Sequence, residues 1–137
     1  KKSKKDFTMD PADVVLTAPA ESPLPPAILR SLGDRSYDKR KNAALEIEAL
    51  IKALQENNDT DRICSVIAML GQDFATSTNA NHRKGGLIGL AATAIGLMQD
   101  IHLYLDALLP PVLHCFDDPE SRVRYYSCES LYNIAEV

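Results

Sequence analysis

The strongest constraint on the fold is a repeat that runs through the sequence with a period of a little over forty residues. Asp34–Arg40 is followed by small or apolar residues at 43, 44, 47 and 50, and Asp118–Arg124 by equivalents at 127, 128, 131 and 134. In both copies an Asp precedes an Arg by six residues. A weaker copy is centred on Arg83, so the three arginines lie 43 and 41 residues apart. A period of this length is typical of helical hairpins that stack side by side.

Six helical segments are expected, because apolar residues recur every three or four positions in each of them. They are a short helix opened by Pro23, Pro25 and Pro26 and stopped by Gly33, then about 36–55, 60–76 with Asp59 as its cap, 82–98 with Asn81 as its cap, 101–116 and 120–136. Pro110 and Pro111 are expected to kink or divide the fifth. The predicted fold is all-α, an α-solenoid of stacked helical hairpins of the HEAT/armadillo type over residues 23–137.

Residues 1–22 form a separate segment. Lys1–Lys5 is a basic cluster, and the residues after it show little periodicity. We interpret the segment as a flexible or expression-derived tail. The repeat domain itself is expected to be part of a longer scaffold.

The composition excludes several functional classes. The net charge is −4 and the isoelectric point about 5.3, so no overall positive field attracts nucleic acid. The three cysteines contain no C-x-x-C pair, which argues against a zinc site or a disulfide framework and fits a reducing cytosol. The apolar run 85–98 is shorter than the roughly 20 residues that span a bilayer, and we interpret it as a buried helix. No cofactor is expected.

Catalysis finds little support in the sequence. His102 and Asp106 are four residues apart, a spacing more typical of a surface contact than of a catalytic pair. His114 and Cys115 are adjacent, so on a helix their side chains point in different directions. A phosphate-binding glycine loop, a nucleophile elbow and an H-E-x-x-H motif are all missing from the sequence. The prediction is a protein that is not an enzyme.

Two surface features are candidates for protein binding. Arg83 and Lys84, followed by Gly85 and Gly86 at a helix start, are suited to hold a phosphate or a partner carboxylate. The alternative is that the glycines serve helix packing and the cations pair between repeats. The second feature combines Arg122 and Arg124 with Tyr125 and Tyr126, residue types enriched at interaction hot spots, although core packing is an alternative use for some of them.

The repeat also predicts a ladder of charges along the stack. Each Asp is placed to accept hydrogen bonds from free backbone amides where the second helix of its hairpin begins. Each Arg lies near a helix N-terminus, where the macrodipole disfavours a cation, so it is expected to pair with an acidic group of the neighbouring repeat. The predicted members of the ladder are Asp34, Arg40, Asp118 and Arg124.

These segments resemble a known family. The runs 82–91, 121–126 and 131–134, together with 37–48, are similar to the N-terminal HEAT repeats of the vacuole-morphology scaffold of the PIKfyve lipid-kinase complex. The resemblance covers about residues 24–137.

The resemblance implies a non-catalytic scaffold that self-associates. Its implied partners are the phosphatidylinositol-3-phosphate 5-kinase and the antagonistic SAC-domain phosphatase, which it holds together to control phosphatidylinositol 3,5-bisphosphate. The implied location is cytoplasmic and peripheral on endosomal or vacuolar membranes. Two alternatives remain open: a module that binds membrane phosphoinositides directly through Lys1–Lys5 and the Arg83-Lys84 helix start, and a generic HEAT adaptor.

Overall fold

The structure is a computed structural model in which residues 22–137 are described; the predicted tail, apart from its last residue, lies outside them. The described part of the chain holds six α-helices and no strand. They are α2 (Pro26–Leu32), α3 (Tyr37–Glu56), α4 (Thr60–Met69), α5 (Ala80–Leu97), α6 (Leu105–His114) and α7 (Ser121–Glu136). Short helical segments extend some of them: the π-helix η2 (Leu70–Ala75) and the 3₁₀ segments η3 (Met98–Leu103) and η4 (Cys115–Asp117). The all-α prediction is confirmed.

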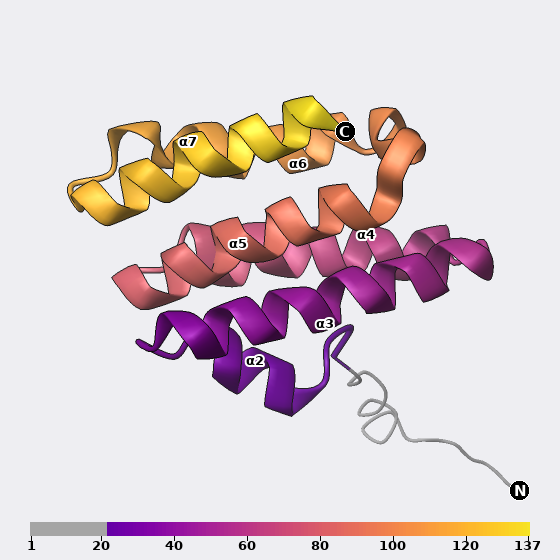
Figure 1. The fold of residues 1–137 in the computed structure, drawn as a ribbon, viewed down its shortest axis with the longest axis horizontal. Coiled ribbons are helices and arrows are strands. Elements are labelled where there is room, and N and C mark those ends of the chain that lie inside the picture. The colour runs from indigo at the N-terminus through magenta and orange to yellow at the C-terminus, as the bar shows by residue number, and fades with distance from the viewer. Residues whose placement is uncertain (1–21) are drawn as a thin grey trace, which may run out of the picture.

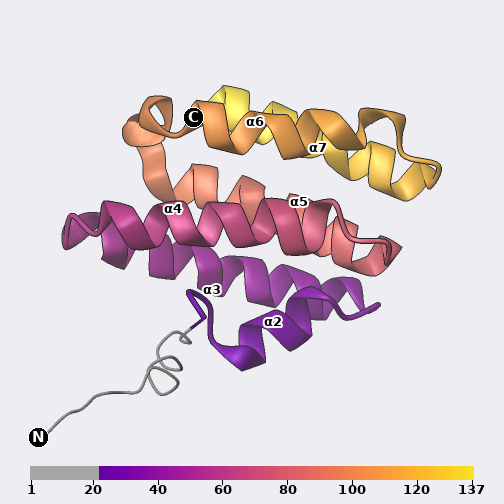
Figure 2. The same cartoon turned by 180° about the vertical axis from the view of Figure 1, so that it is seen from behind.

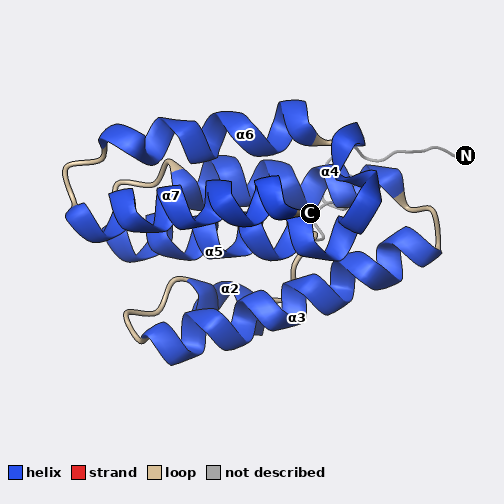
Figure 3. Ribbon diagram, turned by 45° about the horizontal axis from the view of Figure 1, so that its top comes forward, coloured by secondary structure: helices blue, strands red, loops and turns tan. Residues whose placement is uncertain are grey.

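The helices pair into hairpins that stack in chain order: α2 with α3, α4 and its extension η2 with α5, and α6 with α7 (Figure 1). Helices α3, α5 and α7 form one layer, seen in front in Figure 1. Helices α2, α4 and α6 form the other, which faces the viewer in Figure 2. Figure 3 shows the same stack from a third direction, with helix as the only regular element of the described residues. The predicted α-solenoid of stacked hairpins is therefore the observed architecture.

The core lies between the two layers and runs along the whole stack. It is built from the apolar stripes that the sequence predicts, among them Ile47 and Ile51 on α3 and Leu87 and Leu90 on α5, all fully buried. Helix α5 is the central element, because it contacts α3 on one side, α7 on the other and η2 behind it. Burial of this kind is the main stabilising contribution in a helical stack.

The central helix begins a long apolar stretch of the chain. By length and composition alone, Ala80–Leu103 is able to cross a membrane, with a mean hydropathy of 1.3. More than half of that stretch is buried inside the stack, and the core helix of a soluble protein meets the same criterion.

The observed helices differ from those predicted from the sequence at three notable places. Asn79 caps α5 in place of Asn81, since its side chain accepts the amides of Asn81 and His82. The expected helix 60–76 changes to a π-helix at Leu70. The expected helix 101–116 is not divided at its prolines, which lie inside the continuous α6. Instead it is divided at Tyr104, where a 3₁₀ segment ends.

Candidate functional site

The same hydrogen-bonding device opens the second helix of every hairpin. A side-chain oxygen accepts the backbone amide two residues later, and the carbonyl of the same residue accepts the Arg guanidinium six residues later. The carbonyl contacts are Asp34 to Arg40 at 2.9 Å, Ser77 to Arg83 at 3.0 Å and Asp118 to Arg124 at 2.7 Å. The three arginines therefore satisfy turn carbonyls within their own hairpins, which explains the six-residue spacing in the sequence.

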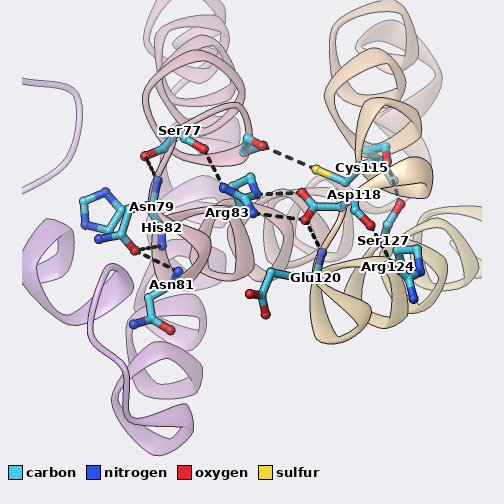
Figure 4. Close-up of polar contacts among 12 residues, drawn as sticks. Ser77, Asn79, Asn81, His82, Arg83, Cys115, Asp118, Glu120, Arg124 and Ser127 are labelled. Carbon is cyan, nitrogen blue, oxygen red and sulfur yellow. Dashed lines mark hydrogen bonds and ion pairs between the residues drawn. The ribbon is translucent and has the colours of Figure 1, made fainter.

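One ion pair joins two hairpins (Figure 4). Arg83 donates from Nε to Oδ2 of Asp118 at 2.6 Å and from Nη2 to Oδ1 at 3.0 Å, a bidentate arrangement. Asp118 is only 8% exposed, and its Oδ1 also accepts the amide of Glu120 at 2.9 Å. Burial by itself raises the pKa of Asp118, but the hydrogen bonds from Arg83 and Glu120 outweigh it, and the pKa lies below its usual value. The hydrogen bond to Asp118 correspondingly raises the pKa of Arg83.

Arg40 differs from the expected ladder. It is 3% exposed, and among the described residues its guanidinium meets no carboxylate. Nη2 donates to the hydroxyl of Tyr126 at 3.2 Å, and the rings of Tyr37 and Tyr126 lie 5.9 and 5.8 Å from Cζ. The reason is Ser77, which occupies in the second hairpin the position that Asp118 occupies in the third. Arg40 therefore contacts aromatic side chains where Arg83 contacts a carboxylate.

The two outer members of the predicted ladder make contacts only within their own hairpins in the described part of the chain. Arg124 is exposed and donates to the carbonyl of Asp118. Asp34 accepts the amide of Ser36 at 2.8 Å and lies 3.6 Å from the ammonium of Lys39. The Ser36 amide, followed by the charge of Lys39, lowers the pKa of Asp34.

The glycines beside Arg83 are packing residues. A Cβ on Gly85 would lie 2.0 Å from the carbonyl oxygen of Leu32, and one on Gly86 would lie 2.5 Å from the amide nitrogen of Ala75. They let the start of α5 pass directly against α2 and η2. Because Arg83 is already paired with Asp118, Lys84 is the one cation of the expected anion site that this pairing leaves available.

The aromatic candidates on α7 divide between the core and the surface. Tyr126 is buried and binds Arg40, whereas Tyr125 is exposed. The guanidinium of Arg122 lies 5.3 Å from the ring of Tyr125 and 5.5 Å from that of Tyr126, within the range of cation–π contacts. Of the residues that the sequence suggested on α7, Arg122 and Tyr125 are both exposed and in contact with each other.

Two hollows, which the sequence analysis did not find, lie on opposite layers of the stack. The first, which we call the α3–α5–α7 groove, is about 220 Å³ and is lined by Tyr37, Lys41, Ala44, Leu45, Glu48, Ile88, Ala91, Ala92, Ile95, Tyr126, Glu129, Ser130 and Asn133. The second is about 450 Å³ and lies between α4, η2 and α6, with Pro110 and Pro111 in its lining. The sequence did contain a signal for the groove: Leu45 and Ile95 are apolar but fall outside the core stripes of their helices. Both are exposed in the structure.

The remaining reactive side chains do not gather into a site. Among residues 22–137, no three His, Cys, Asp or Glu side chains are placed to hold a metal ion. His102 pairs through Nδ1 with the carbonyl of Gln99 at 2.7 Å. Burial raises the pKa of the Cys115 thiol to about 11, and its Sγ contacts the carbonyl of Ala75.

The sequence that forms this stack is similar to a known protein family. The family model described as "Vacuolar 14 Fab1-binding region" matches residues 81–137, which comprise nearly all of α5 and the whole third hairpin. "Protein VAC14 homolog" of Arabidopsis thaliana is 55% identical over 118 residues, 86% of this chain. The chain belongs to the VAC14 family. No solved structure matches it significantly.

The VAC14 relatives extend across kingdoms and are much longer than this chain. "Protein VAC14 homolog" of Schizosaccharomyces pombe is 47% identical over 112 residues, 80% of the chain. "Vacuole morphology and inheritance protein 14" of Saccharomyces cerevisiae is 49% identical over 113 residues, 81% of the chain. The matched stretch spans 13–16% of the length of these three VAC14 proteins.

Proposed function

We propose that this chain is a HEAT-repeat segment of a regulatory scaffold and that it binds the Fab1 lipid kinase, the phosphatidylinositol-3-phosphate 5-kinase. The observation that carries the proposal is the match of residues 81–137 to a Fab1-binding region. Those residues form α5, α6 and α7, which offer a rigid surface with exposed apolar and aromatic side chains. Its mechanism is geometric, because a rigid stack that tethers partners raises their effective concentration.

The wider role follows from the VAC14 relationship. In this proposal the scaffold holds the kinase together with its SAC-domain phosphatase, and so regulates phosphatidylinositol 3,5-bisphosphate on endosomal or vacuolar membranes. The chain contributes the kinase contact. Its own membrane association is proposed to be indirect, through the complex, because Arg83, at the helix start that suggested a phosphoinositide site, is already paired with Asp118. The other cations of that alternative, Lys1–Lys5, lie outside the described residues.

A pull-down of the kinase by this chain, beside a version that begins at Leu24, tests the proposal. Retention of the kinase by both versions would support a contact made by the helical repeats. Retention by the longer version alone would assign the contact to the basic tail, and retention by neither would overturn the proposed function.

A further inference from the structure

Close packing of the central helix α5 lies beneath the α3–α5–α7 groove. Glycines on α5 remove the side chains that would hold it away from its neighbours: a Cβ on Gly89 would lie 2.8 Å from Leu70, and one on Gly96 would lie 3.0 Å from the carbonyl of Glu48. With α5 drawn inward, Ala91 and Ala92 form a low floor between α3 and α7. The packing of the stack itself therefore creates a trough that runs along α5.

The trough is apolar at its floor and charged at its walls. Leu45 on α3 is 55% exposed and Ile95 on α5 is 39% exposed. Lys41 stands on the α3 wall and Glu129 on the α7 wall, both exposed. Glu48, the other acid in the lining, is already paired with Lys52 at 2.9 Å. The groove thus offers an apolar floor between one positive and one negative wall.

The geometry points to a helical ligand. Ile88, Ala91, Ala92 and Ile95 form a single stripe along α5, at the three- and four-residue spacing that the ridges of a second helix fit. A helix recognised in this way presents apolar anchors at positions i, i+3 or i+4, and i+7. More than half of the residues that line the groove lie within 81–137, the stretch matched by the Fab1-binding family model.

We propose that the α3–α5–α7 groove holds an amphipathic helix of the kinase. This inference rests on the proposed function and adds the surface and the chemistry of the bound segment. The apolar stripe of that helix lies on the floor around Ala91 and Ile95. Its acidic flank faces Lys41, and its basic flank faces Glu129. The second hollow lacks this pattern, because no Asp, Glu, Lys or Arg contributes to its lining.

The affinity of the full 137-residue chain for purified kinase tests the groove. The double variant Leu45→Glu/Ile95→Glu places two carboxylates among the apolar side chains of the groove, and we expect it to weaken binding at least about tenfold, as at an interface hot spot. Leu113→Glu on α6 is the matched control, since Leu113 is 46% exposed in the opposite layer and is expected to leave the affinity unchanged. Circular dichroism establishes that each variant keeps its helices.

Two single charge reversals test the groove without changing its apolar side chains. Lys41→Glu and Glu129→Lys alter exposed positions, and each is expected to weaken binding several-fold at low salt and less at high salt. Unchanged affinity in the double variant and in both reversals would overturn the groove while leaving the proposed function in place. The groove would also be overturned if Ala68→Glu, within the second hollow, abolished binding while all the groove variants bound normally. Failure of the unaltered chain to bind the kinase would overturn both proposals.

Discussion

At the scale of single residues, Arg83 and Asp118 form an ion pair between neighbouring hairpins, and among the described residues the arginines at equivalent positions form no such ion pair. Arg83 and Asp118 are each held by several hydrogen bonds, and the carboxylate is nearly inaccessible to water. A buried charge that loses its partner is costly, whereas an exposed one is screened by solvent. The arginines at equivalent positions are therefore expected to differ widely in their effect on stability.

Arg83→Ala is expected to lower the free energy of unfolding by about 2 kcal/mol or more, because it leaves the Asp118 carboxylate buried without its guanidinium. Arg124→Ala, the equivalent change in the third hairpin, removes an exposed side chain and is expected to cost about 0.5–1 kcal/mol. Urea denaturation of both variants measures the difference. Equal losses would contradict the interpretation that the ion pair joins the hairpins.

The same pair makes stability depend on pH. The pKa of Asp118 is lower in the folded state than its ordinary value of 3.8, so the ionised pair contributes fully above that value. The contribution is lost as the pH falls from about 4 through the folded-state pKa. We expect Asp118→Asn to be less stable than the unaltered chain at pH 7 and to lose less further stability below pH 4. Thermal unfolding across this pH range measures both quantities, and parallel curves for the two proteins would exclude this role for Asp118.

At the scale of the helices, close approach at glycine determines where α5 lies. The carbonyl of Leu32 leaves no room for a methyl group on Gly85. Gly85→Ala is therefore expected to destabilise the fold by about 2 kcal/mol, although alanine favours a helix interior by up to about 1 kcal/mol. The neighbouring change Lys84→Ala is the control, with an expected effect within about 0.5 kcal/mol. A Gly85→Ala variant with normal thermal stability would show that α2 and α5 do not need this contact.

The helices and their order were predictable because periodic apolar stripes and the repeat gave consistent signals. The N-cap of α5 was missed, although the repeat frame contains it: Ser36 and Asn79 both precede their arginines by four residues. The π-helix was not predictable, since it depends on how η2 packs against α5 and α6. Within the candidate site, the Asp–Arg spacing indicated that the Asp accepts a backbone amide at the helix start, but not that the Arg binds the carbonyl of the same turn. The aromatic replacement at Arg40 was also not predictable, because it depends on Tyr126, 86 residues away.

At the scale of the whole molecule, the stack formed by residues 22–137 has two different faces. The face of α3, α5 and α7 carries the groove with charged walls, and the opposite face carries the larger hollow beside the prolines of α6. In the proposed interaction at the α3–α5–α7 groove, the kinase recognises the first face. Because a rigid docking surface moves little on binding, its helices are expected to be protected in place rather than refolded.

Hydrogen–deuterium exchange of the full chain, with and without the kinase, tests this account most directly. The account predicts slower amide exchange in α3, α5 and α7, greatest in the peptides that contain residues 88–95 and 126–133, with α2 and α4 unchanged. Protection confined to α2, α4 and α6, or no protection at a kinase concentration that saturates the pull-down, would contradict it.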